Sequence, residues 1–157
     1  MAKFEKILYL SCSQFCVFLS SLDQPYNDWS DRSYTQGFSW RAGGVSFRAL
    51  VDEGDHKINL FINEAVQELS ADVVRAFKVP FFVKDRNIEV SSISDAIPLK
   101  LSEGDYALQV EFMSPRPEGL CEINVRFNKG VSYFEVLRAD AEINEEDDFD
   151  VDAAPAN

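Results

Sequence analysis

The segment 121–128, CEINVRFN, alternates apolar and polar side chains at every position. Successive residues of a β-strand point to opposite faces of a sheet, so this period of two predicts a strand that buries one face. The segment 106–112, YALQVEF, repeats the pattern. Eight further runs of strand character, separated by turn residues, span residues 5–10, 14–19, 45–51, 58–62, 75–83, 87–93, 97–101 and 131–138. Ten short strands predict an all-β protein, built as an antiparallel β-sandwich or a partly open barrel.

Local signals add detail to this predicted sandwich. A turn separates the runs 45–51 and 58–62, which are therefore expected to form a hairpin. Pro80 and Pro98 interrupt strand-like runs, and proline cannot donate to a strand ladder, so these runs are expected at sheet edges or bulges. Residues 64–72 have apolar side chains at helical spacing, but the segment is short and could equally be a loop.

The segment 27–47, NDWSDRSYTQGFSWRAGGVSF, concentrates both tryptophans and three other aromatics in a polar stretch. Asp28 or Ser30 can cap a short helix, and Gly37 can supply the left-handed residue that ends it. A short amphipathic helix must bury one face to be stable, so several of these rings are expected in the core. The segment therefore predicts one short helix beside the sheets.

Several short motifs also stand in a distinctive order along the chain. They are SQFCVF at residues 13–18, WSD at 29–31, GF at 37–38, SF at 46–47, VPF at 79–81 and GDY at 104–106. In these residues the chain resembles the ComJ family, small acidic proteins known as inhibitors of a competence-associated DNA-entry nuclease. The resemblance covers roughly residues 5–113 and extends more loosely to about residue 138. It implies a role in nuclease inhibition, whereas the motifs themselves are structural in type.

The chain of 157 residues has the length of one domain, and its net charge of -12 is unevenly distributed. Residues 140–152 contain eight of the 27 acidic residues and none of the 15 lysines and arginines, so the rest of the chain carries only about -4. This composition predicts a β-sandwich domain over residues 1–139 and a disordered acidic tail over residues 140–157. A protein so negative repels nucleic acid and attracts basic protein surfaces.

Catalytic motifs are scarce in this sequence. The single histidine, His56, stands beside a turn and is expected to be exposed rather than catalytic. Carboxylate pairs for a hydrolase could be drawn from the 27 acids, but no pair lies in a recognisable pattern. Phosphate-binding loops, dinucleotide-binding loops and zinc-protease motifs are absent from the sequence. We therefore expect that the protein is not an enzyme and that it has no catalytic residue and no cofactor.

The residues Asp148, Asp150 and Asp152 have the spacing with which calcium-binding loops begin. The sixth-position glycine and the closing glutamate of such loops do not follow, so no metal site is expected. A calcium- or small-ligand-binding β-sandwich module remains the alternative function, because such modules also expose aromatics and acids on loops.

The cysteines Cys12, Cys16 and Cys121 form an odd set that matches no redox or zinc motif. Free buried thiols in a reducing compartment are the expected state. No segment approaches the roughly 20 apolar residues of a membrane helix. The predicted location is the cytoplasm, with any membrane association made through a nuclease partner.

Charge and the missing catalytic motifs agree with the resemblance. The chain is predicted to inhibit a DNA-degrading nuclease, as a regulator of DNA uptake or as an immunity protein, by occluding its basic DNA-binding or active-site cleft. The expected partner is that nuclease, encoded nearby, with no direct contact to nucleic acid and no small-molecule ligand. Carboxylates of the tail could imitate DNA phosphates, or could serve solubility alone. The predicted partner-binding residues are the rings and acids of two segments: Tyr26, Asp28, Trp29, Asp31, Glu145, Glu146, Asp147, Asp148 and Asp150.

Overall fold

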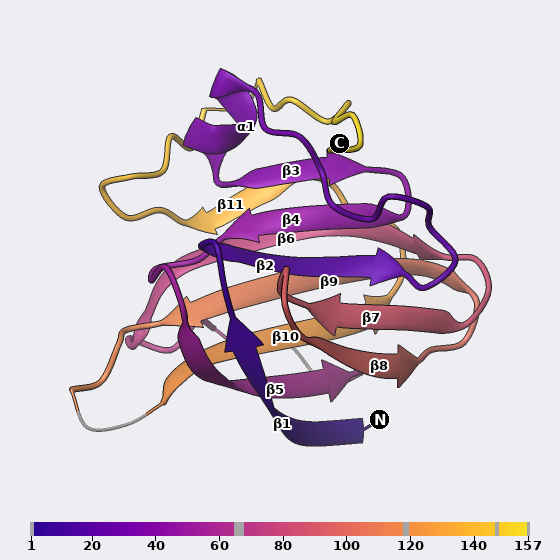
Figure 1. Cartoon of the computed structure of the whole chain (residues 1–157), viewed down its shortest axis with the longest axis horizontal. Helices are drawn as coiled ribbons and strands as arrows, with labels where there is room; N and C mark the ends of the chain where they lie inside the picture. Colours follow the sequence, from indigo (N-terminus) through magenta and orange to yellow (C-terminus); the bar gives the residue numbers. More distant parts are fainter. Residues whose placement is uncertain (1, 65–67, 118–119, 147, 157) are drawn as a thin grey trace.

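The computed structural model describes residues 2–64, 68–117, 120–146 and 148–156. Within these residues two β-sheets pack face to face, and a short helix and the C-terminal segment lie together at one end of them (Figure 1). The all-β sandwich predicted from the alternation of side chains is confirmed.

The larger sheet has six strands. In spatial order they are β1 (Ala2–Leu10), β5 (Gly54–Ile62), β10 (Cys121–Lys129), β9 (Gly104–Met113), β6 (Val73–Val83) and β11 (Glu135–Arg138). Neighbouring strands run antiparallel except β5 and β10, which are parallel. A parallel pair needs a long connection, and here the chain builds four other strands before it returns beside β5.

The smaller sheet has five antiparallel strands. In spatial order they are β3 (Phe38–Arg41), β4 (Gly44–Arg48), β2 (Gln14–Leu19), β7 (Asn87–Ser91) and β8 (Ala96–Lys100). Helix α1 (Asp31–Gln36) directly precedes the edge strand β3. Its six residues are too few to span a bilayer, and the described residues contain no other candidate for a membrane-crossing helix.

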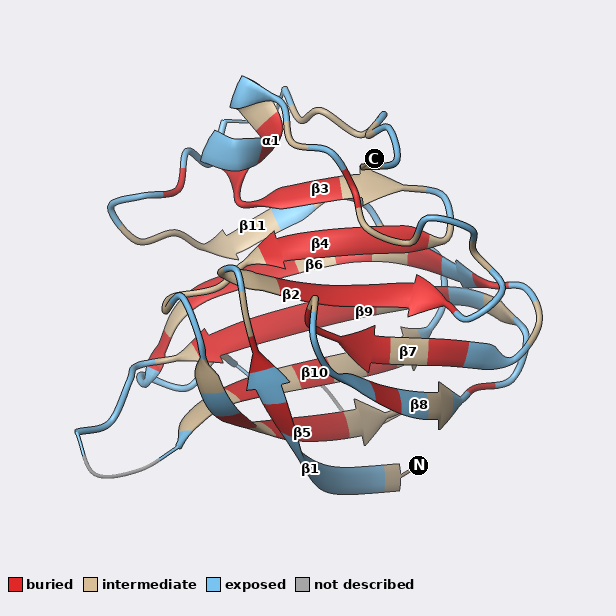
Figure 2. Cartoon of the chain, in the orientation of Figure 1, coloured by how far each residue is buried: buried red, intermediate tan, exposed pale blue. Residues whose placement is uncertain are grey.

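Buried residues lie on the strands of both sheets (Figure 2), and their side chains form one core between the layers. Phenylalanines fill much of it. Phe112 makes edge-to-face contacts with Phe15 and Phe77, at centroid distances of 6.3 and 6.4 Å. Phe77 also contacts Phe47 of the opposite sheet at 5.7 Å. Aromatic pairs in such geometries attract one another beyond the gain from burial, so these rings hold the layers together.

The predicted hairpin between residues 45–51 and 58–62 is wrong. β4 pairs with β2 and β3 in the smaller sheet, whereas β5 pairs with β1 and β10 in the larger one. The connection crosses between the sheets and is held by Ser13, whose N–H donates to the carbonyl of Asp52 and whose carbonyl accepts from the N–H of Ala49. A crossing and a hairpin both need one turn between two apolar runs, so the local sequence does not distinguish them.

Other local expectations have mixed outcomes. Pro98 lies on β8, an edge strand, as predicted. Pro80 lies on β6 beyond the stretch that pairs with β11, so its missing N–H costs no ladder bond on that side. The strand predicted at 131–138 is confined to its second half, and no prediction covered β3. The possible helix at 64–72 falls partly on residues 65–67, outside the described residues, and its described part contains no helix.

Candidate partner-binding surface

Helix α1 and the C-terminal segment lie side by side at one end of the sandwich (Figure 1). Together with the loop before α1, they carry a dense set of carboxylates that we call the acidic face. Its described members are Asp28, Asp31, Glu145, Glu146, Asp148, Asp150 and Asp152. All of these are exposed except Asp150, which is half-buried.

Helix α1 forms because both of its ends are capped. Ser30 Oγ accepts a hydrogen bond from the N–H of Ser33 (3.0 Å), and Ser33 Oγ accepts one from the N–H of Ser30 (2.8 Å). This capping box satisfies N–H groups that a helix start leaves free. Gly37 ends the helix with a φ of +95°, and a Cβ there would lie 2.5 Å from the ring of Phe77. The predicted roles of Ser30 and Gly37 are both observed.

Two apolar side chains anchor the C-terminal segment to the core. Ile143 is buried, and Phe149 packs against Phe38 of β3 with ring centroids 5.5 Å apart. The guanidinium of Arg32, on α1, lies over the Phe149 ring at 5.6 Å from its centroid. Full burial of a large apolar side chain stabilises by roughly 1.5–3 kcal/mol, so these anchors offset part of the entropy lost on ordering the segment.

Polar contacts fix the path of the segment between these anchors. Arg32 donates to the carbonyl oxygens of Glu146 (2.6 Å) and Asp148 (3.1 Å), and it forms an ion pair with the Asp148 carboxylate (3.3 Å). The side-chain amide of Gln36 donates to the carbonyl of Asp150 (2.8 Å) and accepts from the N–H of the same residue (2.9 Å). Helix α1 thus determines where the acidic side chains stand.

Backbone pairing holds the last described residues. The N–H of Asp28 donates to the carbonyl of Ala154 (2.8 Å), and the N–H of Ala153 donates to the carbonyl of Trp40 (3.0 Å). The N–H of Ala156 donates to the carbonyl of Tyr26 (2.9 Å). This part of the chain therefore runs in a strand-like path beside the loop that precedes α1, and it reaches the edge strand β3 at Trp40.

The structure differs here from the expectation of a disordered tail over residues 140–157. Composition predicts disorder when a segment cannot bury enough apolar surface by itself. This segment is ordered by contacts with the rest of the fold. Ile143 and Phe149 pack against the core, and the loop before α1 and Trp40 of β3 supply partners for its backbone. In the described part of the tail, the acids consequently stand at fixed positions rather than on a flexible string.

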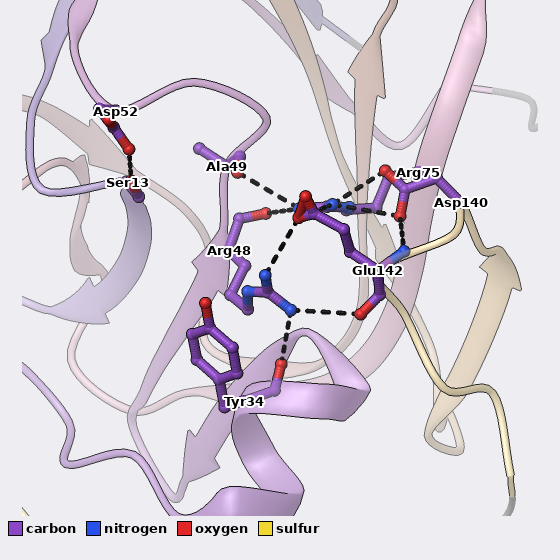
Figure 3. A network of polar contacts seen from close by, with 8 residues as sticks. All are labelled: Ser13, Tyr34, Arg48, Ala49, Asp52, Arg75, Asp140 and Glu142. Carbon is purple, nitrogen blue, oxygen red and sulfur yellow. Dashed lines mark hydrogen bonds and ion pairs between the residues drawn. The ribbon is translucent and has the colours of Figure 1, made fainter.

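A buried arginine fastens the start of the segment (Figure 3). Arg75 of β6 is 1% exposed, and its guanidinium lies 2.8 Å from the carboxylate of Asp140. It also donates to the carbonyl of Arg48 (2.9 Å). Arg48 in turn pairs with Glu142 (3.2 Å) and stacks on the ring of Tyr34, 3.8 Å from its centroid. Burying a guanidinium is costly unless it is paired, so Arg75 requires the carboxylate that the tail brings.

No expectation covered Arg75, although its signal is present in the sequence. The residue has the same parity along β6 as Phe77, Val79 and Phe81, which all face the core. An arginine on the inward side of a strand must find a buried partner. The burial of Arg75 could therefore have been predicted from the sequence, but its partner Asp140 could not.

The predicted rings of the surface are less accessible than expected. Tyr26 and Trp29 are half-buried, and Tyr26 packs edge-to-face against Phe18 at a centroid distance of 5.9 Å. Tyr34 of α1 is 54% exposed and is the more accessible ring on this surface, although no prediction included it. Asp147, the remaining predicted residue, lies outside the described residues.

His56 is buried, so the expectation of an exposed turn residue is wrong. Its side chain is 3% exposed, and its Nδ1 lies 2.9 Å from the carbonyl oxygen of Gly54. Burial lowers the pKa of His56 below its ordinary value, because the charged form loses solvation. β5 already begins at Gly54, and His56 shares the inward parity of Ile58 and Leu60. The residue is part of the core.

The carboxylates considered for calcium engage separate partners. Asp148 pairs with Arg32, whereas Asp150 accepts from the hydroxyl of Ser30 (2.6 Å) and from the N–H of Asp152 (3.1 Å). Across the described ranges, no cluster of three or more His, Cys, Asp or Glu side chains is arranged to hold a metal ion. The structure therefore lends the calcium alternative no support.

The three cysteines are free thiols in different surroundings. Cys16 is buried, and this burial raises the pKa of its thiol to about 12. Cys121 is half-buried. Cys12 is exposed, contrary to the expectation of buried thiols, because it lies with a φ of +55° in the turn between β1 and β2. The fold thus shields the three thiols to different degrees.

The structure is that of a small β-sandwich protein with an acidic face formed by α1, the loop before it and the C-terminal segment. Comparison with known families agrees with the resemblance seen in the sequence motifs. The chain belongs to the competence protein J (ComJ) family, whose model matches residues 7–129.

Solved structures with this fold include two similar proteins. One is ComJ from Bacillus subtilis, whose crystal structure is described as that of an inhibitor of the DNA-degrading activity of NucA. Its sequence is 24% identical to this chain. The two structures superpose with a TM-score of 0.70, over 81% of this chain and 96% of that chain. A protein described as crocagin biosynthetic gene J has 15% identity and a TM-score of 0.58 over 83% of this chain and 100% of that chain. At these identities, both comparisons establish a shared fold. No curated protein sequence matches the chain.

Proposed function

We propose that this protein inhibits a DNA-degrading nuclease by covering its basic DNA-binding or active-site cleft with the acidic face. The observation that carries the proposal is the fixed arrangement of carboxylates on α1, on the loop before it and on the tail. Membership in the ComJ family supports it, as does the description of the Bacillus subtilis relative as an inhibitor of NucA.

Electrostatics favour a partner of this kind. A cleft that binds DNA must present positive charge to phosphates, and ordered carboxylates can pair with the same lysines and arginines. The contacts of Arg32 and Gln36 hold the tail in place despite the repulsion among its acids. Less conformational entropy is lost on binding when a surface is ordered beforehand. In this proposal the tail contributes to binding and not only to solubility.

The proposal assigns no turnover to the protein. Covering the cleft is enough to stop a nuclease, and burial keeps His56 from acting as an accessible base. The partner is a nuclease encoded nearby, which serves DNA uptake or is a toxin against which this protein confers immunity. The encounter takes place in the cytoplasm, or at a membrane to which the nuclease is attached. Three free thiols support a reducing location.

Stoichiometric inhibition tests the proposal. The purified protein is mixed with the nuclease encoded beside its gene and, as a second probe, with NucA of Bacillus subtilis, and the degradation of linear DNA is followed. One equivalent should abolish degradation by at least one of the two nucleases, without binding of the protein to DNA. Undiminished degradation by both nucleases at a large excess of the protein would refute the proposal.

Charge reversal tests whether the acidic face is the binding surface. Glu145→Lys combined with Glu146→Lys should weaken inhibition by about 100-fold at low salt. The loss should shrink at high salt because exposed charges are screened. The matched control, Glu5→Lys combined with Asp55→Lys, makes the same change of charge on β1 and β5, which lie far from α1 in Figure 1. Equal losses in both variants would mean that only the net charge matters.

A further inference from the structure

Two neighbouring grooves are lined by residues at the end of the described tail, next to the acidic face. Residues 152–154 line a groove beside Asp28 and Trp29. The next residue, Pro155, lines a larger groove of about 770 Å³, which lies between the β3–β4 turn, the loop after β2 and the second half of β6. We call this the apolar groove. Its apolar walls include Leu22, Trp40, Ala42, Pro80, Phe82 and Pro155.

The apolar groove follows from the way β6 ends. β11 pairs with β6 only as far as Lys78, so in the described structure the last part of β6 has no strand beside it on that edge. The carbonyl of Pro80 accepts a hydrogen bond from Trp40 Nε1 (2.9 Å), which bridges the two sheets at this point. Phe82, two residues further on, remains 49% exposed. A half-exposed aromatic ring that lines the same groove as an indole marks a place where another molecule can bury apolar surface.

Exposed carboxylates alone do not account for tight inhibition. Surface charge pairs steer association and select partners, whereas most of the binding free energy comes from a few apolar or aromatic side chains that become buried. The apolar groove offers such a place directly beside the acidic face. The N–H of Ala153 donates to the carbonyl of Trp40, so the tail forms the wall that the two surfaces share.

We propose that the apolar groove receives an apolar side chain from a surface loop of the nuclease whose basic cleft meets the acidic face. This inference rests on the proposed function and identifies where the partner gains its affinity. A basic protein bound to Asp28, Asp150 and Asp152 would extend across the tail to the apolar groove. The two grooves are neighbours, because residues 152–154 line the smaller one and Pro155 lines the apolar groove.

The charges around the apolar groove fit an apolar occupant. Its lining contains two acidic residues, Asp23 and Asp105, and two basic ones, Arg41 and Lys84, so the formal charges there cancel. Arg41 is already engaged, since its guanidinium donates to the side-chain oxygen of Asn27 and to a backbone carbonyl of the loop after β2. The acidic face thus selects a basic partner, and the groove selects an apolar side chain on it.

Substitution of Phe82 tests this assignment. Binding of a catalytically inactive form of the nuclease encoded beside the gene is measured by calorimetry at low and at high salt. Phe82→Ser should weaken binding at least about tenfold. The factor should be the same at both salt concentrations, because an apolar contact is not screened. Tyr133→Ser is the control, since Tyr133 is 78% exposed but lies outside the groove, and it should change affinity less than about twofold.

Ala42→Glu separates an apolar anchor from simple charge attraction. Ala42 is exposed and lines the groove. If charge alone governed binding, the added carboxylate would tighten the complex with a basic nuclease. Because the longer side chain obstructs the groove, we expect weaker binding instead. Thermal unfolding of each variant verifies that the fold is intact.

The outcomes distinguish this inference from the proposed function. If the wild-type protein binds the nuclease and Phe82→Ser binds equally well, the groove assignment is overturned and the proposed function stands. If the wild-type protein binds neither that nuclease nor NucA, both are overturned. Self-association of the wild-type protein that Phe82→Ser abolishes, with unchanged affinity for the nuclease, would assign the groove to a second copy of this chain.

Discussion

Gly37 has a left-handed backbone conformation, and a Cβ added there would lie 2.5 Å from the ring of Phe77. Gly37→Ala is expected to lower the free energy of unfolding by about 2–4 kcal/mol, from backbone strain together with overpacking. Gly54 also has a positive φ, +137°, but an added Cβ would meet nothing within 4 Å, so Gly54→Ala should cost only about 1 kcal/mol. Urea denaturation of both variants measures the difference. Equal losses would mean that the Phe77 ring moves aside freely.

His56 makes the stability of the fold depend on pH. Burial lowers its pKa in the folded protein, so the unfolded chain binds this proton more readily. The stability that neutral His56 contributes is complete above the unfolded pKa of roughly 6.5 and is lost as the pH falls below it. The free energy of unfolding should therefore decline as the pH falls below about 7, and His56→Gln should flatten this decline. Denaturation curves at several pH values check it, and an unchanged slope in the variant would assign the effect to other groups.

For single residues, the position in the strand alternation predicts burial better than the residue type does. His56 shares parity with Ile58, and Arg75 shares parity with Phe77, so continuing the alternation would have placed both polar residues inside. The turn beside His56 favoured an exposed position for that residue instead, and no prediction was made for Arg75. The partner that makes burial possible, such as Asp140 for Arg75, comes from a distant part of the chain and is not visible in a local pattern.

Among the elements, regular strands could be located from the sequence but their pairing could not. The alternation found in residues 106–112 and 121–128 corresponds to β9 and β10. β3 has only four residues, too few to display a period, and it was missed. The pairing of β5 with β10 brings His56 opposite Cys121, a contact between segments far apart in the chain. Such pairings depend on the total burial of both sheets rather than on any local signal.

The attachment of the C-terminal segment can be tested at Asp140. Asp140→Asn removes the closer of the two carboxylates that pair with the buried guanidinium of Arg75, because Glu142 lies at 3.5 Å, and should lower the free energy of unfolding by about 2–3 kcal/mol. The double variant Arg75→Met, Asp140→Asn removes the buried charge as well and should be more stable than Asp140→Asn alone. Urea unfolding of the wild type, both single variants and the double variant gives the comparison. Simple addition of the two single losses would show that the pair does not interact.

In the whole molecule, the net negative charge is concentrated outside the β-sandwich. About two-thirds of the net charge lies in the tail, and the fold carries that charge to helix α1 (Figure 1). Composition therefore predicts that the partner's binding surface is positively charged. It could not predict the order of the tail, because that order depends on surfaces contributed by α1 and the edge of the smaller sheet.

This arrangement predicts fast, salt-sensitive association with the nuclease. Replacing four acids by their amides (Asp28→Asn, Asp31→Asn, Glu145→Gln and Glu146→Gln) should lower the association rate constant about tenfold at low ionic strength. The dissociation rate should rise by a smaller factor, because steering acts before contact whereas the lost pairs act only within the complex. Stopped-flow measurements over a range of salt concentrations provide both rates. An association rate that does not respond to salt in the wild type would contradict this prediction.

The parallel pairing of β5 with β10 has a consequence for biosynthesis. After residues 1–62 leave the ribosome, β1 can join β5, but the opposite edge of β5 waits for residues 121–129. At roughly 5–20 residues per second, translation leaves this edge unpaired for about 3–12 s. Unpaired edges invite aggregation, so the nascent chain should depend on a chaperone during this interval. The acidic residues of the tail emerge after every strand of the larger sheet, so the acidic face is complete only once that sheet can close.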